Sequence, residues 1–272
     1  MMKLIVLAAG SGRRMGQSLR GQPKCLIEVG GRTLLDWQLD AWSKAGGAIE
    51  DVVIVTGHGA THLEAMQSHG CTLVHNSEHA TTNMVHSLLC AEAHFGEGFV
   101  MSYGDIAYEA GVMATVLRSD KPISVVVDTC WREYWQERFD DVLADAESLT
   151  TNGRGLITSI GQKSANADDI EAQYIGLAAF RRKGVAALRA AHALAQSGGV
   201  DARRVFANLE NRPARTMYMT DLLQGLINLG AAVAAVPIEG GWVEVDSQRD
   251  VEIAEGRLAA KRHKESKKGL GV

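Results

Sequence analysis

Short apolar runs recur along the first half of the chain, and stretches with helical periodicity separate them. The runs that predict buried strands cover residues 4–7, 52–56, 72–74, 99–103 and 123–127. After the first of them, residues 34–45 keep one helical face apolar until Gly46 ends the pattern. Strands that alternate with helices predict an α/β fold with a mostly parallel, Rossmann-like sheet sandwiched by helices.

The pattern loosens after Asp128. Residues 130–152 are rich in Trp, Tyr, Arg and Asp, and strand-like runs follow at 156–160 and 174–180. We interpret residues of about 129–180 as an insertion that covers one end of the sheet.

The last part of the chain returns to helical and strand-like patterns. Helices are predicted at residues 185–196 and 221–229. A strand that ends at residue 238 and a last helix that begins at residue 247 follow them. No repeat or linker divides the chain, so we expect one domain over residues 1–262. Residues 263–272 are basic and follow the last periodic helix, which predicts a flexible tail.

Composition narrows the class of protein. With 272 residues and 46% hydrophobic content, the chain can bury a sizeable core. A sequence pI near 6.1 and only five each of Trp, Tyr and Phe give no basic surface with interleaved aromatics, so we expect no nucleic-acid partner. The apolar runs are too short to span a bilayer, which argues against membrane attachment.

The cysteines and the N-terminus indicate a cytoplasmic protein. Cys25, Cys71, Cys90 and Cys130 are far apart and form no C-x-x-C pair, which argues against a disulfide framework. The chain enters a strand at once and shows no signal-peptide pattern. A homodimer is compatible with these features, although the sequence does not fix the oligomeric state.

The first strand leads into a glycine-rich loop made of Leu7, Ala8, Ala9, Gly10, Ser11 and Gly12. Backbone N–H groups that face outward from such a loop can cradle phosphates. The loop is followed by cationic residues with only Glu28 opposing them: Arg13, Arg14, Arg20, Lys24 and Arg32. Because the whole chain has a formal charge of −4, this positive charge is local and predicts a polyanion here.

The spacing of this loop excludes two other phosphate-binding motifs. A dinucleotide fingerprint needs glycine where Met15 stands, and a P-loop starting at Gly10 would need glycine at Met15 and lysine at Gly16. The alternative that remains is an ordinary strand-turn-helix crossover with solvated arginines.

Two aspartates are candidate metal ligands. Asp105 follows an apolar strand through Gly104, where ligands bind in open α/β sheets, and Asp246 shares an alternating face with Trp242 and Glu244. Magnesium prefers one or two carboxylates together with phosphate oxygens. A turn or helix-cap role is the alternative for each, above all for Asp246 before Ser247.

Histidines and aromatics offer weaker signals. His58/His62 and His75/His79 have i,i+4 spacing, but His75 ends a strand-like run and no H-E-x-x-H motif is present, which disfavours zinc. The segment Trp131-Arg-Glu133-Tyr134-Trp135-Gln-Glu137 could bind a cationic group through cation–π contact. Aromatic packing between the insertion and the sheet explains the same residues equally well.

The glycine loop resembles a family signature. Leu-x-A-G-x-G-x-R-M from Leu7, followed by Pro23-Lys24, is similar to the nucleotidyltransferases with a glycosyltransferase-A-like fold, which act on sugar phosphates, the molybdenum cofactor or phosphocholine. The resemblance continues over Asn83-x-x-x-Ser87-Leu88, Tyr103-Gly104-Asp105 and residues 242–254. It implies that Asp105 and the Glu244-x-Asp246 aspartate hold Mg²⁺.

Within that superfamily, several segments look like the cytidylyltransferases of phosphocholine and phosphonates. They are Asn83-Met-Val-His-Ser-Leu, Asp141-x-x-x-Asp145-x-Glu147, Ile157-x-x-Ile160-Gly-x-Lys163, Gln173-Tyr174-Ile-Gly176-Leu and Thr220-Asp-Leu-Leu-Gln. Sugar-nucleotide enzymes continue the first loop as R-L-x-P-x-T, whereas this chain has Arg14-Met15-Gly16-Gln17, which disfavours a hexose-1-phosphate.

The resemblance implies a Mg²⁺-dependent transfer of CMP from CTP to a small phosphonate or phosphocholine-like acceptor. Residues 7–13 and Gly104 would bind the nucleotide, Arg13 would act in catalysis with Lys24, and Asn83 and Ser87 would recognise the base. Lys24 would also contact the acceptor, together with residues on the insertion and near the metal: Trp131, Tyr134, Tyr174 and Glu244.

Other functions stay open at this stage. One is a sugar-1-phosphate or molybdopterin nucleotidylyltransferase. Another is a catalytically silent nucleotide-binding subunit, against which the joint presence of Arg13, Lys24, Asp105 and Asp246 argues.

Overall fold

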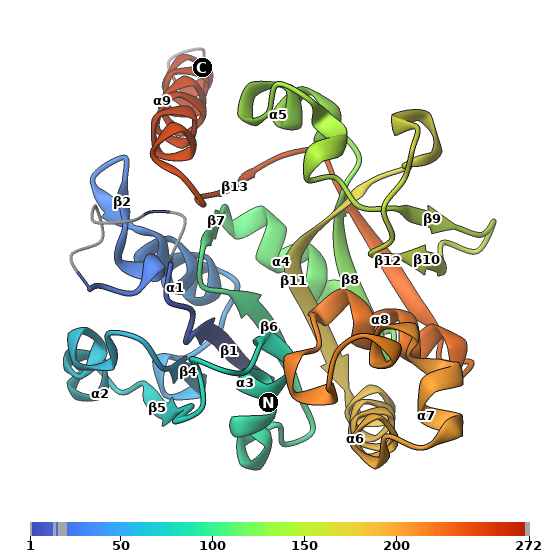
Figure 1. The fold of residues 1–272 in the computed structure, drawn as a ribbon. Helices are drawn as coiled ribbons and strands as arrows, with labels where there is room; N and C mark the ends of the chain where they lie inside the picture. The colour runs from blue at the N-terminus through green and yellow to red at the C-terminus, as the bar shows by residue number, and fades with distance from the viewer. Residues whose placement is uncertain (1, 13–14, 16–20, 270–272) are drawn as a thin grey trace.

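The computed structural model describes residues 2–12, 15 and 21–269 of the chain, with side chains up to Leu258. Within them the largest sheet has seven strands in the order β12-β8-β11-β6-β1-β4-β5 (Figure 1). Their bounds are β1 (Lys3–Ala8), β4 (Val52–Thr56), β5 (Thr72–His75), β6 (Gly98–Tyr103), β8 (Ile123–Asp128), β11 (Gln173–Arg181) and β12 (Val233–Ile238). The apolar runs of the first half are therefore confirmed as strands.

The sheet is mostly parallel, as predicted. β11 runs antiparallel to both of its neighbours, β6 and β8, whereas the other neighbouring pairs are parallel. The strands alternate their side chains between two cores: Leu4 and Val6 of β1 join one apolar cluster, and Ile5 joins the other. A sheet buried on both faces explains why its strands read as continuous apolar runs.

Helices cover each of these two faces. α1 (Leu34–Lys44) and α4 (Ala110–Arg118) contribute to the core that contains Leu4, and α3 (Met84–Cys90), α6 (Arg182–Ser197) and α8 (Met219–Asn228) to the one that contains Ile5 (Figure 1). The predicted helices are thus present, with ends that differ by a few residues.

Smaller elements surround this body. The remaining α-helices are α2 (Ala65–Ser68), α5 (Trp131–Arg138), α7 (Val200–Val205) and α9 (Gln248–Gly269). Three two-stranded pairs are β2 (Glu28–Val29) with β3 (Arg32–Thr33), β7 (Ile106–Tyr108) with β13 (Trp242–Glu244), and β9 (Leu149–Thr151) with β10 (Ile157–Ile160). The 3-10 helices are η2 (Lys24–Leu26), η3 (Ile49–Asp51), η4 (Ala60–Leu63), η5 (Glu92–His94), η6 (Val142–Ala144), η7 (Ala167–Asp169), η8 (Ala207–Glu210) and η9 (Ala214–Thr216).

The stretch predicted as an insertion, about 129–180, divides into two parts. α5, β9 and β10 lie outside the main sheet, but β11 is one of its central strands. The segment outside the sheet is therefore shorter than predicted. An apolar run shows that a strand is buried but not in which direction it runs or between which neighbours, and this is why the sequence did not separate β11 from the insertion.

The C-terminal segment also differs from its prediction. α9 continues to Gly269, so most of the predicted flexible tail, residues 263–272, is helical. Among the helices of the described residues, none has both the length and the apolar character needed to cross a membrane.

Candidate active site

The end of β1 and the loop that carries Asp105 lie against each other. Gly104 N–H donates to the carbonyl of Leu7 at 3.0 Å, and a Cβ on Gly104 would lie 2.6 Å from that same oxygen. Only glycine allows this approach, so Gly104 fixes Asp105 next to the glycine loop. Arg13, predicted to bind the triphosphate and act in catalysis, lies outside the described residues.

Lys24 joins two carboxylates from distant parts of the chain. Its Nζ lies 3.2 Å from Asp105 Oδ2 and also contacts Asp246 Oδ1. Burial alone would lower the pKa of Lys24, but the negative charges of Asp105 and Asp246 outweigh it and the pKa is raised. The predicted residues therefore meet in one place, and the lysine is held there as an ammonium.

Gln38 of α1 holds the loop of Asp105 in place by hydrogen bonds to its backbone. This fully buried amide donates to the carbonyls of Tyr103 at 2.9 Å and Ile106 at 2.7 Å, on either side of Asp105. The pairing of β7 with β13 then brings in the second acidic loop, because Val245 N–H donates to the carbonyl of Asp105 at 2.9 Å. Two buried polar networks thus position the two aspartates.

The start of α9 decides between the two roles considered for Asp246. Ser247 and Asp250 form a reciprocal cap: Ser247 N–H donates to Asp250 Oδ2 at 2.8 Å and Asp250 N–H to Ser247 Oγ at 3.3 Å. Ser247 is therefore the capping residue, and the carboxylate of Asp246 points to Lys24 instead. The helix-cap alternative for Asp246 is thereby excluded.

Asp105, Glu244 and Asp246 could hold a metal ion. One ligand atom from each lies within 4.8 Å of the others, and the buried Asp105 Oδ1 has no hydrogen-bond partner among the described residues. An all-carboxylate donor set with an unsatisfied buried oxygen fits a hard divalent cation such as Mg²⁺. Glu244, predicted as an acceptor contact, also belongs to this group; burial and the nearby Asp246 and Asp105 raise its pKa to about 7.

A cavity of about 140 Å³ lies beside this group, on the side of the glycine loop. Six residues predicted to bind the nucleotide line it: Leu7, Ala9, Gly10, Asn83, Ser87 and Gly104. Asn83 caps α3 by accepting from Met84 N–H at 2.9 Å, and Ser87 Oγ accepts from Asn76 at 3.0 Å. His79 and Thr82 also line the cavity, although no motif in the sequence points to them as nucleotide-binding residues.

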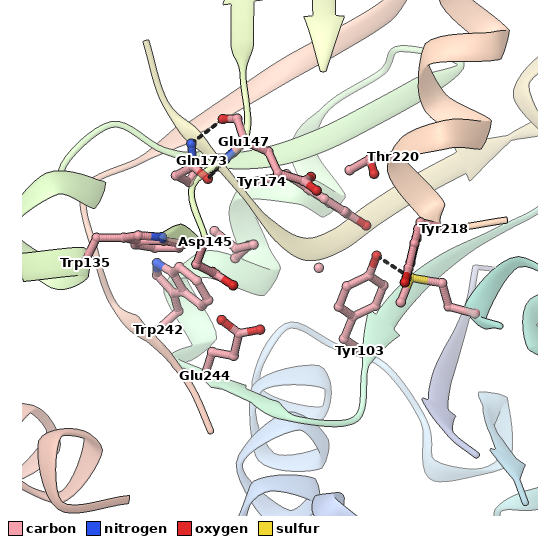
Figure 2. Close-up of a pocket in the computed structure, with 13 residues that line it drawn as sticks. Tyr103, Trp135, Asp145, Glu147, Gln173, Tyr174, Tyr218, Thr220, Trp242 and Glu244 are labelled. Atoms are coloured by element: carbon pink, nitrogen blue, oxygen red, sulfur yellow. Dashed lines mark hydrogen bonds between the residues drawn. The ribbon is translucent and has the colours of Figure 1, made fainter. Parts of the chain in front are cut away.

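A second cavity of about 200 Å³ adjoins the first, because Met84 and Tyr103 line both (Figure 2). Its wall combines aromatic rings with carboxylates: Tyr103, Trp135, Tyr174, Tyr218, Trp242, Asp145, Glu147 and Glu244. Among the described residues that line it, none is a lysine or an arginine. Tyr174 and Glu244 were predicted to contact an acceptor and are among these residues.

Trp131 and Tyr134, also predicted as acceptor contacts, are not among the residues that line this cavity. Both are buried behind its wall. Tyr134 OH accepts from the backbone N–H of Glu244 at 2.8 Å, and the Trp131 ring meets the edge of Trp135 with 6.0 Å between centroids. The ring that faces the cavity from α5 is Trp135, whose role the sequence left undecided.

Glu147 is a half-buried carboxylate in the wall of this cavity. Its backbone N–H donates to Gln173 Oε1 at 3.1 Å, and Gln173 Nε2 donates back to its carbonyl at 2.6 Å. Burial, with repulsion from Asp145 and Asp221, raises the pKa of Glu147 to about 7 despite the opposing charge of Lys163. Glu147 was part of a segment resembling cytidylyltransferases but was not predicted as a site residue.

The histidines do not form a metal centre in the part of the chain that the structure describes. The His79 ring lies 6.4 Å from His58 and 6.3 Å from His75, centroid to centroid. Within that part, Asp105, Glu244 and Asp246 are the group whose ligand atoms come close enough to share an ion.

Known proteins resemble this chain over most of its length. A family model described as MobA-like NTP transferase domain matches residues 4–212. The chain is 31% identical over 261 residues to the CTP:phosphoglutamine cytidylyltransferase of Campylobacter jejuni, with 93% of this chain and 98% of the relative covered. It is 28% identical to the CMP-5'-(3-aminopropyl)phosphonate synthase of Streptomyces rubellomurinus, over 55% of this chain and 24% of that protein.

A solved structure confirms the fold. The CTP:phosphocholine cytidylyltransferase of Streptococcus pneumoniae superposes with a TM-score of 0.67 at 17% identity, covering 94% of this chain and 99% of that one. At this identity the likeness concerns the fold alone, and it confirms the predicted nucleotidyltransferase fold of the glycosyltransferase-A-like type.

Proposed function

The chain belongs to the MobA-like NTP transferase family, and we propose that it is a Mg²⁺-dependent cytidylyltransferase acting on a small phosphonate or phosphocholine-like acceptor. An oxygen of the acceptor's phosphonate or phosphate group bonds to the α-phosphorus of CTP. The bond from that phosphorus to the oxygen bridging to the β-phosphate breaks, and pyrophosphate leaves with the electron pair. One observation carries the proposal: Lys24, Asp105 and Asp246 meet beside the cavity that the glycine loop lines, with Asp105 in its wall.

The cavity lined by the glycine loop is the proposed nucleotide site. We expect the backbone N–H groups of residues 10–12 to face the triphosphate, Arg13 to bind it, and Asn83 and Ser87 to recognise the base. CTP as the nucleotide is supported by relatives whose names state cytidylyl transfer or a CMP product.

Catalysis on two anionic reactants requires positioning and charge neutralisation. The attacking oxygen is already ionised near pH 7, so no general base is needed. Lys24 contacts both the α-phosphate and the acceptor oxygen, and its raised pKa keeps it cationic throughout. Its ammonium therefore stabilises charge that builds on the transferring group.

Asp105 and Asp246 are the residues that would hold Mg²⁺. When bound, the ion would neutralise negative charge on the phosphate oxygens around the α-phosphorus. Asp105 Oδ1, which has no hydrogen-bond partner among the described residues, is available to bind a cation.

The second cavity is the proposed acceptor site. Its carboxylates and aromatic rings, with no basic side chain among the described residues of its wall, favour an acceptor whose far end carries an ammonium group. Arg138 does not offer its charge to the cavity, because Glu244 and Asp250 bind it. Arg132 pairs with Asp168 and Arg154 is exposed. An aminophosphonate or phosphocholine therefore fits better than a carboxyphosphonate or a hexose phosphate.

A pyrophosphate-release assay tests this function. The protein is incubated with Mg²⁺, each of the four NTPs and one acceptor at a time: 2-aminoethylphosphonate, phosphocholine, phosphonoacetate or glucose-1-phosphate. We expect the highest kcat/KM with CTP and an ammonium-bearing acceptor. Turnover of glucose-1-phosphate alone would instead support a sugar nucleotidylyltransferase, and preference for GTP the molybdopterin branch. No release with any pair, although CTP binds, would support a silent nucleotide-binding subunit.

A further inference from the structure

Arg138 is buried beside the acidic turn that connects β13 to α9. Its side chain is only 1% exposed. Its guanidinium carbon lies 5.3 Å from the ring centre of Tyr134, 5.4 Å from that of Trp135 and 5.0 Å from that of Phe139. Aromatic rings from α5 and the residue after it thus hold the guanidinium in one orientation.

In that orientation the three guanidinium nitrogens face three different acids. Nε donates to Asp250 Oδ1 at 2.8 Å and Nη1 to Glu244 Oε2 at 2.5 Å. Nη2 has no hydrogen-bond partner and lies 3.9 Å from Asp246 Oδ2. Arg138 is therefore connected to each acid of the turn, and most weakly to the one proposed to hold the metal.

Asp250 extends this connection to the main chain. Its Oδ2 accepts from the backbone N–H of Asp246 at 3.0 Å, while its Oδ1 accepts from Arg138. The guanidinium thereby fixes the backbone of Asp246 through one intermediate carboxylate. Four carboxylates meet two cations here, Lys24 and Arg138, which leaves a formal negative charge that one divalent ion would balance.

We propose that Arg138 is a positioning residue that binds one oxygen of Glu244 and orients Asp246 toward Asp105. The inference rests on the proposed function only in taking Asp105 and Asp246 as the metal-binding pair. A guanidinium is suited to this role because its planar fork binds several carboxylate oxygens at once, which a lysine ammonium on a flexible stem does not reproduce. Residues that orient metal ligands typically change metal affinity 10- to 100-fold when they are replaced.

The test measures Mn²⁺ binding by electron paramagnetic resonance in the presence of CTP and without acceptor. Arg138→Lys is compared with the matched control Arg257→Lys, because Arg257 also lies over the Tyr134 ring, at 4.4 Å, but pairs with Glu137. We expect Arg138→Lys to bind Mn²⁺ at least ~10-fold more weakly and to lower kcat, with acceptor KM changed less than about 3-fold. Arg257→Lys should match the wild type.

Mn²⁺ affinity of a folded Arg138→Lys within about 2-fold of the wild type would overturn the proposal. If that variant does not fold, Asp250→Asn tests the same path, since it keeps the Arg138–Glu244 pair but weakens the link to the backbone of Asp246. We expect weaker Mn²⁺ binding there too, and unchanged binding would equally overturn the proposal. Because no transfer is needed for this readout, absence of turnover with every acceptor would count against the proposed function and leave this test intact.

Discussion

Lys24 and Asp246 are separated by 222 positions in the chain, yet the ammonium of one contacts the carboxylate of the other. The β7–β13 pair makes this possible by carrying the C-terminal acidic turn to the loop of Asp105. The contact gives the molecule a cationic group and two anionic groups beside the cavity that the glycine loop lines. Substitutions of Asp105, Asp246 and Lys24 therefore test the chemistry of this site.

Asp105→Asn and Asp246→Asn should each lower kcat at least ~100-fold, because each removes a charge that holds Mg²⁺ at the reacting phosphates. The amides are nearly isosteric with the acids, so circular dichroism and the Tm should show an intact fold. Asp40→Asn is a matched control, since Asp40 pairs with Lys44 at the surface of α1. Near-normal turnover of either variant with Mg²⁺ would remove that residue from the metal site.

Lys24→Ala should cost about 3 kcal/mol or more of transition-state stabilisation, if the ammonium contacts the transferring group. Steady-state kinetics measure this as a fall in kcat/KM for both substrates. Lys44→Ala, which removes an exposed lysine, should have no such effect. A change confined to acceptor KM would make Lys24 a binding residue only.

The sequence was most informative where chemistry is local. Asp105 could be singled out because a carboxylate after a strand end is a local pattern, and Lys24 and Asp246 because their motifs resemble those of the family. The structure brings these three residues together. The direction of β11 could not be predicted from the sequence, since an apolar run fits parallel and antiparallel neighbours alike.

The wall of the acceptor cavity was harder to predict for a geometric reason. Trp131, Tyr134, Trp135 and Arg138 all lie on the buried face of α5. Helical spacing places them on one side but does not tell which of them reaches the cavity, because that depends on how the helix packs on β13. The sharing of Glu244 between Arg138 and the metal group is likewise a tertiary feature with no local signature.

Replacing Trp135 should affect the acceptor, whereas replacing Trp131 should affect stability. Loss of the Trp135 ring in Trp135→Leu should weaken binding of an ammonium-bearing acceptor by about 0.5–2 kcal/mol, read as a rise in acceptor KM. Trp131→Leu should lower the Tm with acceptor KM nearly unchanged, because the buried Trp131 only packs against its neighbours. The reverse pattern would return Trp131 to the acceptor site.

Glu147 should make acceptor binding depend on pH. Its pKa, raised to about 7 by burial, means that the carboxylate is protonated below that pH and ionised above it. Binding of an ammonium should therefore strengthen as the pH rises from about 6 to about 8.

The acceptor titrates in the same range, so the ratio of acceptor KM in Glu147→Gln to that in the wild type is the quantity to measure. We expect this ratio to increase with pH, since only the wild type gains a charge. Glu133→Gln serves as control because Glu133 is exposed on α5 and does not line the cavity. A ratio that stays constant across the range would exclude Glu147 from acceptor recognition.

We expect the protein to transfer a cytidylyl group to an acceptor that it selects by its positive charge. Its most direct test is a competition followed by phosphorus NMR, with CTP, Mg²⁺ and equal amounts of 2-aminoethylphosphonate and phosphonoacetate, and with GTP replacing CTP in a parallel sample. The acidic and aromatic cavity predicts that the CMP ester of the aminophosphonate accumulates first and that GTP gives little product. Faster formation of the carboxyphosphonate ester, or equal use of GTP, would contradict the account.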